Sequence, residues 1–180
     1  ICRIRQLPDG HNFTLMCRDL SELSTYAFVD NVAFRLMKNN TPGVYIEGNV
    51  VIGEDCKIGP NCYIRGNTSV GDRCHIGQAV EIKNSLLGDK VSIGHLSYAG
   101  DSVICDRVNF GAGTIISNLR HDGRNHRWLE NQAFVDTGRR KFGAIIGENV
   151  HTGIHTAIYP GRSLSENSMT VPGEVVSHSK

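Results

Sequence analysis

Residues 46–82 read IEGNVVIGEDCKIGPNCYIRGNTSVGDRCHIGQAVEI, and an aliphatic residue returns at every sixth position of this stretch. The series continues to residue 116 with an occasional five-residue step. Its anchors are Ile46, Ile52, Ile58, Ile64, Val70, Ile76, Ile82, Leu87, Ile93, Ala99, Ile104, Phe110 and Ile116. Eight of these thirteen anchors are followed directly by glycine. A period of six fits neither an α-helix nor the alternation of an ordinary strand.

A six-residue repeat fits a triangular solenoid, in which each hexad forms one flat side and its aliphatic residue fills the interior. Glycine lets the backbone turn at the corner. Three hexads make one coil, so residues eighteen apart lie one above the other at roughly 4.8 Å, the spacing of hydrogen-bonded parallel strands. We therefore predict an all-β chain with a parallel β-helix over residues 44–176.

Length and composition suit one such domain with appendages. The 180 residues include 19 Lys and Arg against 18 Asp and Glu, which gives no reason to expect nucleic acid or an anionic membrane as partner. No apolar run approaches the roughly 20 residues that cross a bilayer, and the N-terminus lacks the form of a signal peptide. A cytoplasmic location is expected. Cys56, Cys62 and Cys74 share the fifth hexad position, which indicates packing rather than a disulfide or metal site.

Residues 1–43 lie outside the repeat. They begin without methionine, as expected of the carboxyl-terminal part of a longer protein or of a trimmed chain. Tyr26, Val29, Ala33 and Leu36 are spaced as on one face of a helix, which predicts a helix over residues 20–38. This helix is expected either to cap the first coil or to link it to an upstream domain.

The hexads stop after Ile116 and resume at Ile146, so residues 119–141 form an insertion. Insertions in solenoids leave the coil as a loop on one face, often the functional one. The basic residues of this loop outnumber its acidic ones and are Arg120, Arg124, Arg127, Arg139, Arg140 and Lys141. A solvated surface explains any one of them, whereas the whole cluster favours an anion such as phosphate.

Three side chains are informative because the repeat does not require them. Arg65 and Lys83 occupy positions where glycine is usual and are eighteen residues apart, so they stack on neighbouring strands. Stacked cations repel each other, which favours a bound anion; two splayed, hydrated side chains are the alternative. His95, within the stretch GHLSYAGD at 94–101, is a candidate acid–base group, although a lone histidine is more often structural.

Residues 64–123 closely resemble the acetyltransferase domain of the bifunctional glucosamine-1-phosphate acetyltransferase and N-acetylglucosamine-1-phosphate uridylyltransferase family. The matching stretches are AVEIK at 79–83, GHLSYAGD at 94–101, VNFGAGTI at 108–115 and SN at 117–118. The insertion and GRRKFG at 138–143 resemble the archaeal sugar-1-phosphate nucleotidylyltransferase/acetyltransferase type. The resemblance implies left-handed winding of the β-helix.

The resemblance also implies acetyl transfer from acetyl-CoA to an amino-sugar 1-phosphate, with glucosamine-1-phosphate as the first candidate, in nucleotide-sugar synthesis. It makes His95 the general base, which agrees with the need to deprotonate an attacking amine near neutral pH. The other implied roles are the sugar phosphate for Arg65 and Lys83, the sugar for Tyr98, Asn109 and Asn118, and the thioester for the backbone amide of Ala112.

Two departures from the family concern the loop and the CoA contacts. The bacterial pattern has a lysine shortly after the residue that corresponds to Asn118, and Lys141 is a candidate substitute. A serine that helps to bind CoA aligns with Ile154. Arg139 and Arg140 are candidate CoA contacts, and no metal is expected.

The family implies a homotrimer with active sites between subunits. A filled coil has no room for a ligand, and its flat sides are too shallow to bury one, so geometry points the same way. Two alternatives stay open: a non-catalytic oligomerisation or regulatory solenoid, and a γ-class carbonic anhydrase, which needs three histidines on zinc. Nucleotidyl transfer is not expected from this chain alone, because the Gly-rich domain that performs it is not among these residues.

Overall fold

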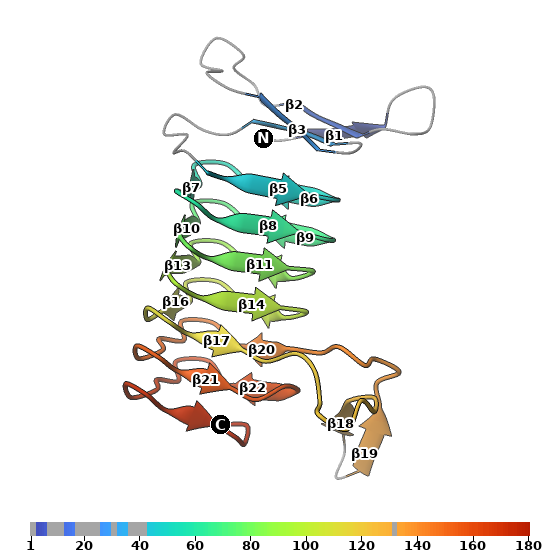
Figure 1. Ribbon diagram of the computed structural model, residues 1–180, viewed down its shortest axis with the longest axis vertical. Helices are drawn as coiled ribbons and strands as arrows, with labels where there is room; N and C mark the ends of the chain where they lie inside the picture. Colours follow the sequence, from blue (N-terminus) through green and yellow to red (C-terminus); the bar gives the residue numbers. More distant parts are fainter. Residues whose placement is uncertain (1–2, 7–12, 17–25, 30–31, 36–42, 131–132) are drawn as a thin grey trace.

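The computed structural model describes residues 3–6, 13–16, 26–29, 32–35, 43–130 and 133–180. From Gly43 onward the backbone winds as a column of stacked coils, with the C-terminus at the end opposite the N-terminal strands (Figure 1). Every strand pair within the column is parallel. The predicted all-β parallel solenoid is confirmed, and its left-handed winding stays a prediction.

Three parallel sheets form the sides of the column. The first sheet contains β5 (Tyr45–Glu47), β8 (Tyr63–Arg65), β11 (Glu81–Lys83), β14 (Tyr98–Gly100), β17 (Ile115–Ile116), β21 (Ala157–Ile158) and β23 (Val175–Val176). The second contains β6 (Val50–Ile52), β9 (Thr68–Val70), β12 (Leu86–Leu87), β15 (Val103–Ile104), β20 (Ala144–Ile146) and β22 (Arg162–Leu164). The third contains β7 (Lys57–Ile58), β10 (His75–Gln78), β13 (Ser92–His95) and β16 (Asn109–Phe110).

The interior of the column is the one that the hexad repeat predicts. All thirteen anchors are buried, none of them more than 7% exposed. Residues of successive coils are direct partners, as Ile82 pairs with Ile64 on one strand and with Ala99 on the next. Cys56 and Cys74 also stack as predicted, with the Cys74 N–H donating to Cys56 Sγ at 3.4 Å. Each coil therefore buries its aliphatic residues against those of its neighbours.

The described N-terminal residues form a four-stranded sheet over the first coil (Figure 1). Its strands, in spatial order, are β1 (Arg3–Gln6), β2 (Phe13–Met16), β4 (Val32–Arg35) and β3 (Tyr26–Val29). The helix predicted over residues 20–38 is wrong for its described part, because β3 and β4 pair antiparallel there. The runs YAFV and VAFR are rich in aromatic and β-branched residues, which favour strands. Residues 20–25, 30–31 and 36–38 of that prediction lie outside the described residues.

Residues 119–141 leave the column between β17 and β20, as predicted. They contain an antiparallel hairpin of β18 (Arg127–Glu130) and β19 (Ala133–Asp136), which projects from the column near its C-terminal coils (Figure 1). The base of the insertion is closed by a bridge between Leu119 and Lys141. Among the residues that the structure describes, none forms a helix with the length and apolarity that a membrane span requires.

Candidate functional site

Arg65 and Lys83 stack on the first sheet in the predicted register, and Gly100 is the next residue of the same row. Each cation has a carboxylate partner. Arg65 Nη2 lies 2.8 Å from Glu81 Oε1, and Lys83 Nζ lies 3.4 Å from Asp101 Oδ2. These carboxylates compensate the repulsion between the cations, so a phosphate at this site is supported by the resemblance and not by the repulsion.

Asp101 is the centre of a polar cluster at the end of β14. Its side chain is 10% exposed. Besides Lys83, it accepts hydrogen bonds from Asn84 Nδ2 at 2.7 Å and from Asn118 Nδ2 at 2.5 Å. Three donors satisfy this carboxylate, as a nearly buried charge requires. The cluster therefore fixes Lys83 and Asn118 relative to each other although they lie on different coils.

Tyr98 and Asn118, the predicted sugar contacts, touch each other within this cluster. Asn118 Nδ2 donates to the Tyr98 hydroxyl oxygen at 3.0 Å. Because that oxygen accepts, the hydroxyl hydrogen remains available to a ligand. Burial raises the pKa of the Tyr98 phenol, so at neutral pH it is an uncharged donor.

Gly100 provides the space that the cluster occupies. A Cβ at this position would clash with the Tyr98 hydroxyl and would lie 2.8 Å from Asn118 Nδ2. In the row of residues that starts with Arg65 and Lys83, the third position is Gly100. The space that a side chain would occupy there holds Tyr98 from the same coil and Asn118 from the next. The absence of a side chain at Gly100 is therefore what leaves room for Tyr98 and Asn118.

His95 ends β13 on the third sheet, and its side chain is exposed. The backbone there is held firmly, since the His95 carbonyl accepts the Ser97 hydroxyl at 2.7 Å and the Gly113 N–H at 3.2 Å. His75 lies on the preceding coil of the same sheet. Burial lowers the pKa of His75, and the nearby Lys57 and His95 add to the effect. Because its carbonyl accepts two hydrogen bonds, the His95 backbone is rigid, and the exposed imidazole projects from it.

Asn109 and Ala112 follow His95 on the next coil. Asn109 is exposed on β16, where it pairs with Ser92. The Ala112 carbonyl accepts the His155 N–H at 2.8 Å, and the residue after Ala112 binds the His95 carbonyl. The structure thus gathers the predicted residues into two groups. His95, Asn109 and Ala112 belong to the third side of the column, while Arg65, Lys83, Tyr98 and Asn118 belong to the first.

Arg139, Arg140 and Lys141, the loop residues predicted to contact CoA or the acceptor, lie at the base of the insertion and are exposed. The bridge from Lys141 to Leu119 brings the Lys141 backbone next to Asn118, and the Phe142 N–H donates to the Asn118 carbonyl at 3.0 Å. Arg140 Nε donates to the Gly123 carbonyl at 3.1 Å. The assignment of Arg139 and Arg140 to CoA stays a prediction.

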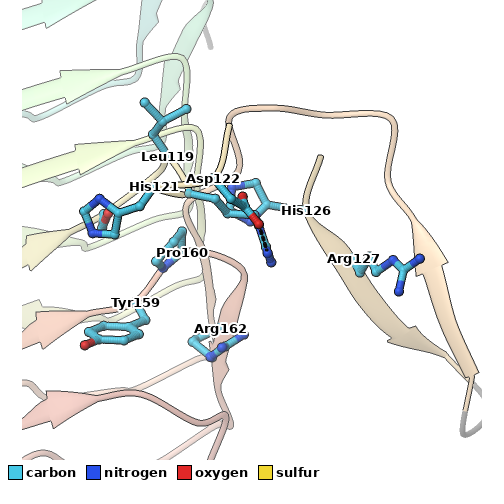
Figure 2. Close-up of a pocket in the computed structure, with 10 residues that line it drawn as sticks. Leu119, His121, Asp122, His126, Arg127, Tyr159, Pro160 and Arg162 are labelled. Atoms are coloured by element: carbon cyan, nitrogen blue, oxygen red, sulfur yellow. Dashed lines mark hydrogen bonds and ion pairs between the residues drawn. The ribbon is translucent and has the colours of Figure 1, made fainter. Parts of the chain in front are cut away.

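A cavity of about 440 Å³ opens between the insertion and the coil of β21 and β22 (Figure 2). The side chains around it include Arg120, His121, His126, Arg127, Tyr159 and Arg162. Sequence reasoning singled out Arg120 and Arg127 only as parts of a basic loop, and it missed His126, Tyr159 and Arg162. The local positive charge of the loop was the one signal available: His126 lies within the loop, whereas Tyr159 and Arg162 follow it in sequence and lie beside it because of the stacking of the coils.

Comparison with known proteins agrees with the resemblance found in the sequence. A family model described as the GMPPB C-terminal domain matches residues 46–175. The bifunctional sugar-1-phosphate nucleotidylyltransferase/acetyltransferase of Sulfurisphaera tokodaii is 46% identical over 167 residues, covering 82% of this chain and 42% of that protein. The uncharacterized protein YciO of Escherichia coli (strain K12) is 96% identical over 45 residues, covering 25% of this chain and 22% of that protein. The chain therefore spans less than half the length of these curated relatives.

Among solved structures, PerB from Caulobacter crescentus in complex with CoA and GDP-perosamine is 12% identical, with a TM-score of 0.31, covering 77% of this chain and 47% of that one. The family match and the archaeal relative confirm the resemblance. The column is a hexapeptide-repeat, acetyltransferase-like β-helix related to bifunctional sugar-1-phosphate nucleotidylyltransferase/acetyltransferases.

Proposed function

Since the chain belongs to the GMPPB C-terminal domain family, we propose that its β-helix transfers the acetyl group of acetyl-CoA to the amine of an amino-sugar 1-phosphate. Glucosamine-1-phosphate is the first candidate acceptor. The proposal is carried by the 46% identity with an archaeal sugar-1-phosphate nucleotidylyltransferase/acetyltransferase. The polar cluster supports it, because Asp101 joins Lys83 to Asn118, Asn118 contacts Tyr98, and the resemblance assigns these residues to the acceptor.

In this reaction the amine nitrogen attacks the thioester carbonyl carbon, and the proton lost by the nitrogen passes to the His95 imidazole. The backbone N–H of Ala112 stabilises the oxyanion of the tetrahedral intermediate. Collapse of the intermediate breaks the carbon–sulfur bond, and the imidazolium returns the proton to the departing CoA thiolate. The rigid backbone at His95 suits this role, because a general base must be held within reach of the attacking amine.

The acceptor's phosphate binds Arg65 and Lys83. After its contact with Asp101, the Lys83 ammonium still has N–H groups for a phosphate oxygen. The Tyr98 hydroxyl, which accepts from Asn118, donates its hydrogen to a sugar oxygen. Charge-assisted bonds to the phosphate supply affinity, and the fixed phenol and amide supply orientation.

The proposal includes a homotrimer with sites between subunits. Ile82, Ile93 and Ile104 fill the coils, so the column offers no internal room. The predicted site residues are divided between two sides of the column, and each side is flat. Leu86 and Val103 are exposed cross-strand partners on the second side, an apolar strip that packing against another copy would cover. A cleft formed between columns would bring the two groups of residues together from neighbouring chains.

Subunit mixing tests the shared site. We expect inactive His95→Ala subunits and inactive subunits that lack residues 119–141 to recover part of the activity after dissociation and reassembly together. Sites that take His95 from one parent and the loop from the other account for the recovery. A monomer by light scattering, or mixed oligomers without activity, would refute the shared site.

Release of free thiol from acetyl-CoA, measured with glucosamine-1-phosphate, galactosamine-1-phosphate and unphosphorylated glucosamine, tests the reaction and the acceptor together. We expect release with a 1-phosphate and much less without it. Arg65→Ala and Lys83→Ala should raise the acceptor KM about 10- to 100-fold, the loss of a bond to a charged group, with little change in the KM for acetyl-CoA. Lys57→Ala, an exposed cation on β7 of another side of the column, is the control. No release with any amino-sugar 1-phosphate would contradict the function and favour a non-catalytic solenoid.

A further inference from the structure

The hairpin of the insertion and the column enclose a groove whose lining residues have no assigned role in the proposed acetyl transfer. The cavity of about 440 Å³ has a neighbour of about 450 Å³, around which lie Trp128, Phe134 and His178. Arg127 and Arg162 line both cavities. We name the two cavities together the hairpin groove, and its middle is marked by these two arginines.

Both arginines carry a positive charge, and the hydrogen-bond partners that the structure gives Arg162 are backbone carbonyls. Arg162 Nε and Nη1 donate to the carbonyls of Ser177 and Gly161, at 2.7 and 3.3 Å. Among the residues whose side chains the structure describes, no carboxylate forms an ion pair with Arg127 or Arg162. Figure 2 shows Arg127 on the hairpin and Arg162 on the column, and both residues line the two cavities. Guanidinium groups that line a cavity attract an anion into it.

Arg120, in the same groove, has a carboxylate partner. Its Nε and Nη2 donate to the two carboxylate oxygens of Asp122, at 2.9 and 2.6 Å. This bidentate pair leaves little of the Arg120 charge for a ligand. The unpaired positive charge of the groove is therefore concentrated at Arg127 and Arg162.

His126 provides an independent indication of a ligand. The residue lines the first cavity and is 2% exposed, and its Nε2 is buried without a hydrogen-bond partner among the described residues. A buried polar atom without a partner costs about 1–3 kcal/mol, so such atoms are rare unless something binds them. The backbone fixes the position, since the His126 N–H donates to the Arg139 carbonyl at 2.8 Å and its carbonyl accepts the Thr137 N–H at 3.0 Å.

The second cavity adds aromatic surface on the same hairpin. The Trp128 ring packs edge-on against Phe142, with the ring centroids 5.9 Å apart, which fixes its orientation. Phe134, on the neighbouring strand, is 67% exposed. A flat heterocycle gains stacking energy on such rings whatever its hydrogen-bonding pattern. The groove thus offers guanidinium groups in its middle and the ring of Trp128 at one end.

We propose that the hairpin groove binds a nucleotide, with its phosphates at Arg127, Arg162 and His126 and its base against Trp128. The site goes beyond the proposed acetyl transfer, because none of these residues is the proposed general base or a member of the acceptor cluster. Two sources share this chemistry. One is the phosphorylated adenosine part of CoA, and the other is a free nucleotide that is not an acyl donor.

Binding can be followed without any activity, because Trp128 is the single tryptophan of the chain. ADP and UDP are titrated while Trp128 fluorescence is recorded, with adenosine and inorganic phosphate as the separated halves of the ligand. We expect a saturable change with at least one nucleotide, and binding at least about tenfold weaker for either half, because each makes only part of the contacts. Failure of acetyl transfer would leave this result intact, so the two proposals fail separately.

Variants locate the ligand. Arg127→Gln should weaken nucleotide binding about 10- to 100-fold, the value of a charge-assisted bond. Because Arg127 has no ion pair among the described side chains, this change should not affect folding, and a thermal melt checks that. Arg124→Gln, on the same loop but lining neither cavity, should change the affinity less than about twofold. His126→Phe, which keeps a ring but removes both nitrogens, should weaken binding as well.

Competition distinguishes the two sources. If CoA displaces the nucleotide and Arg127→Gln raises the KM for acetyl-CoA, the groove holds the nucleotide end of the acyl donor; if CoA does not displace it, the groove belongs to a separate nucleotide. Either result supports the site. Neither ADP nor UDP giving a fluorescence change or heat of binding at millimolar concentration would overturn the proposal, as would equal affinities for Arg127→Gln and Arg124→Gln.

Discussion

The column and the inserted hairpin follow different rules of construction. In the column every strand has a partner one coil away, and Ile82 is enclosed by Ile64 and Ala99 of the adjacent coils. In the hairpin β18 and β19 pair only with each other, and all four residues of β19 are exposed. Because the repeat fixes the register and buries the anchors, the outward-facing side chains of the column occupy fixed positions. The described side chains of β19 form no such interior, and Arg127, Trp128 and Phe134 line a cavity together with residues of the column.

The largest expected effect tests whether the column holds the chemistry. His95→Ala should lower kcat by about 100- to 10,000-fold, the usual contribution of a general base. The side chain projects outward, so the free energy of unfolding should change by less than about 0.5 kcal/mol. His151→Ala, an exposed histidine on the same side of the column, is the matched control for activity and for urea unfolding. Parallel losses of activity and stability in His95→Ala would make this histidine structural.

The second prediction compares a buried residue of the column with an exposed residue of the hairpin. Ile82→Ala should reduce the free energy of unfolding by about 2–5 kcal/mol, because it leaves a cavity in a coil that neighbours enclose from above and below. Phe134→Ala removes a larger side chain from the hairpin, where it is exposed, and should cost less than about 0.5 kcal/mol. Urea unfolding of both variants is the measurement. Similar losses would mean that the hairpin carries a core of its own.

The same contrast explains what could be predicted from the sequence. The period of six predicted the buried anchors, the parallel stacking and the alignment of Arg65 with Lys83, because in a solenoid the sequence distance determines the spatial neighbour. The break in that period also predicted the insertion. Residues 20–38 have no such repeat, and their apolar spacing fits a helix or a pair of strands. Without a dominant period, the preference of YAFV and VAFR for strands prevailed over the helical spacing.

Side-chain contacts between coils were less predictable. The resemblance assigned roles to Tyr98 and Asn118, yet nothing in the spacing showed that Asp101 connects Asn118 with Lys83. That connection depends on rotamers and on the space at Gly100. The hairpin groove could not be predicted for a related reason, since Arg162 and Arg127 line one cavity only because the insertion lies beside the column.

A third prediction uses the space at Gly100. Gly100→Ala should raise the acceptor KM about tenfold, because the new methyl group clashes with the Tyr98 hydroxyl and crowds the Asn118 amide, and about 1.4 kcal/mol of binding corresponds to that factor. Gly94→Ala is the matched control for acceptor KM, since its Cβ would meet no atom closer than His75 Cε1 at 3.8 Å. An unchanged acceptor KM in Gly100→Ala would show that Tyr98 and Asn118 do not contact the acceptor.

The smallest effect concerns the junction of the two regions, and it is a dependence of stability on pH. Burial lowers the pKa of His126 below its ordinary value of about 6.5, and Arg120 and Arg162 add to this, while the Asn118 carbonyl and Asp122 oppose it. The unfolded chain therefore binds more protons than the folded one as the pH falls through about 6.5, so acid removes stability. We expect the free energy of unfolding to be lower at pH 5.5 than at pH 7.5, and part of this difference to disappear in His126→Phe.

His75, whose pKa burial also lowers, contributes to the same pH dependence from within the column. His75→Phe is therefore the matched variant, and the comparison of the two variants divides the pH dependence between column and junction. If the hairpin groove binds a nucleotide, saturating ADP or UDP should give the folded His126 a partner and reduce its share. A pH dependence in His126→Phe equal to that of the unmodified chain would show that His126 accepts a proton in the folded state as readily as in the unfolded one. Its unpartnered nitrogen would then no longer support an anion site.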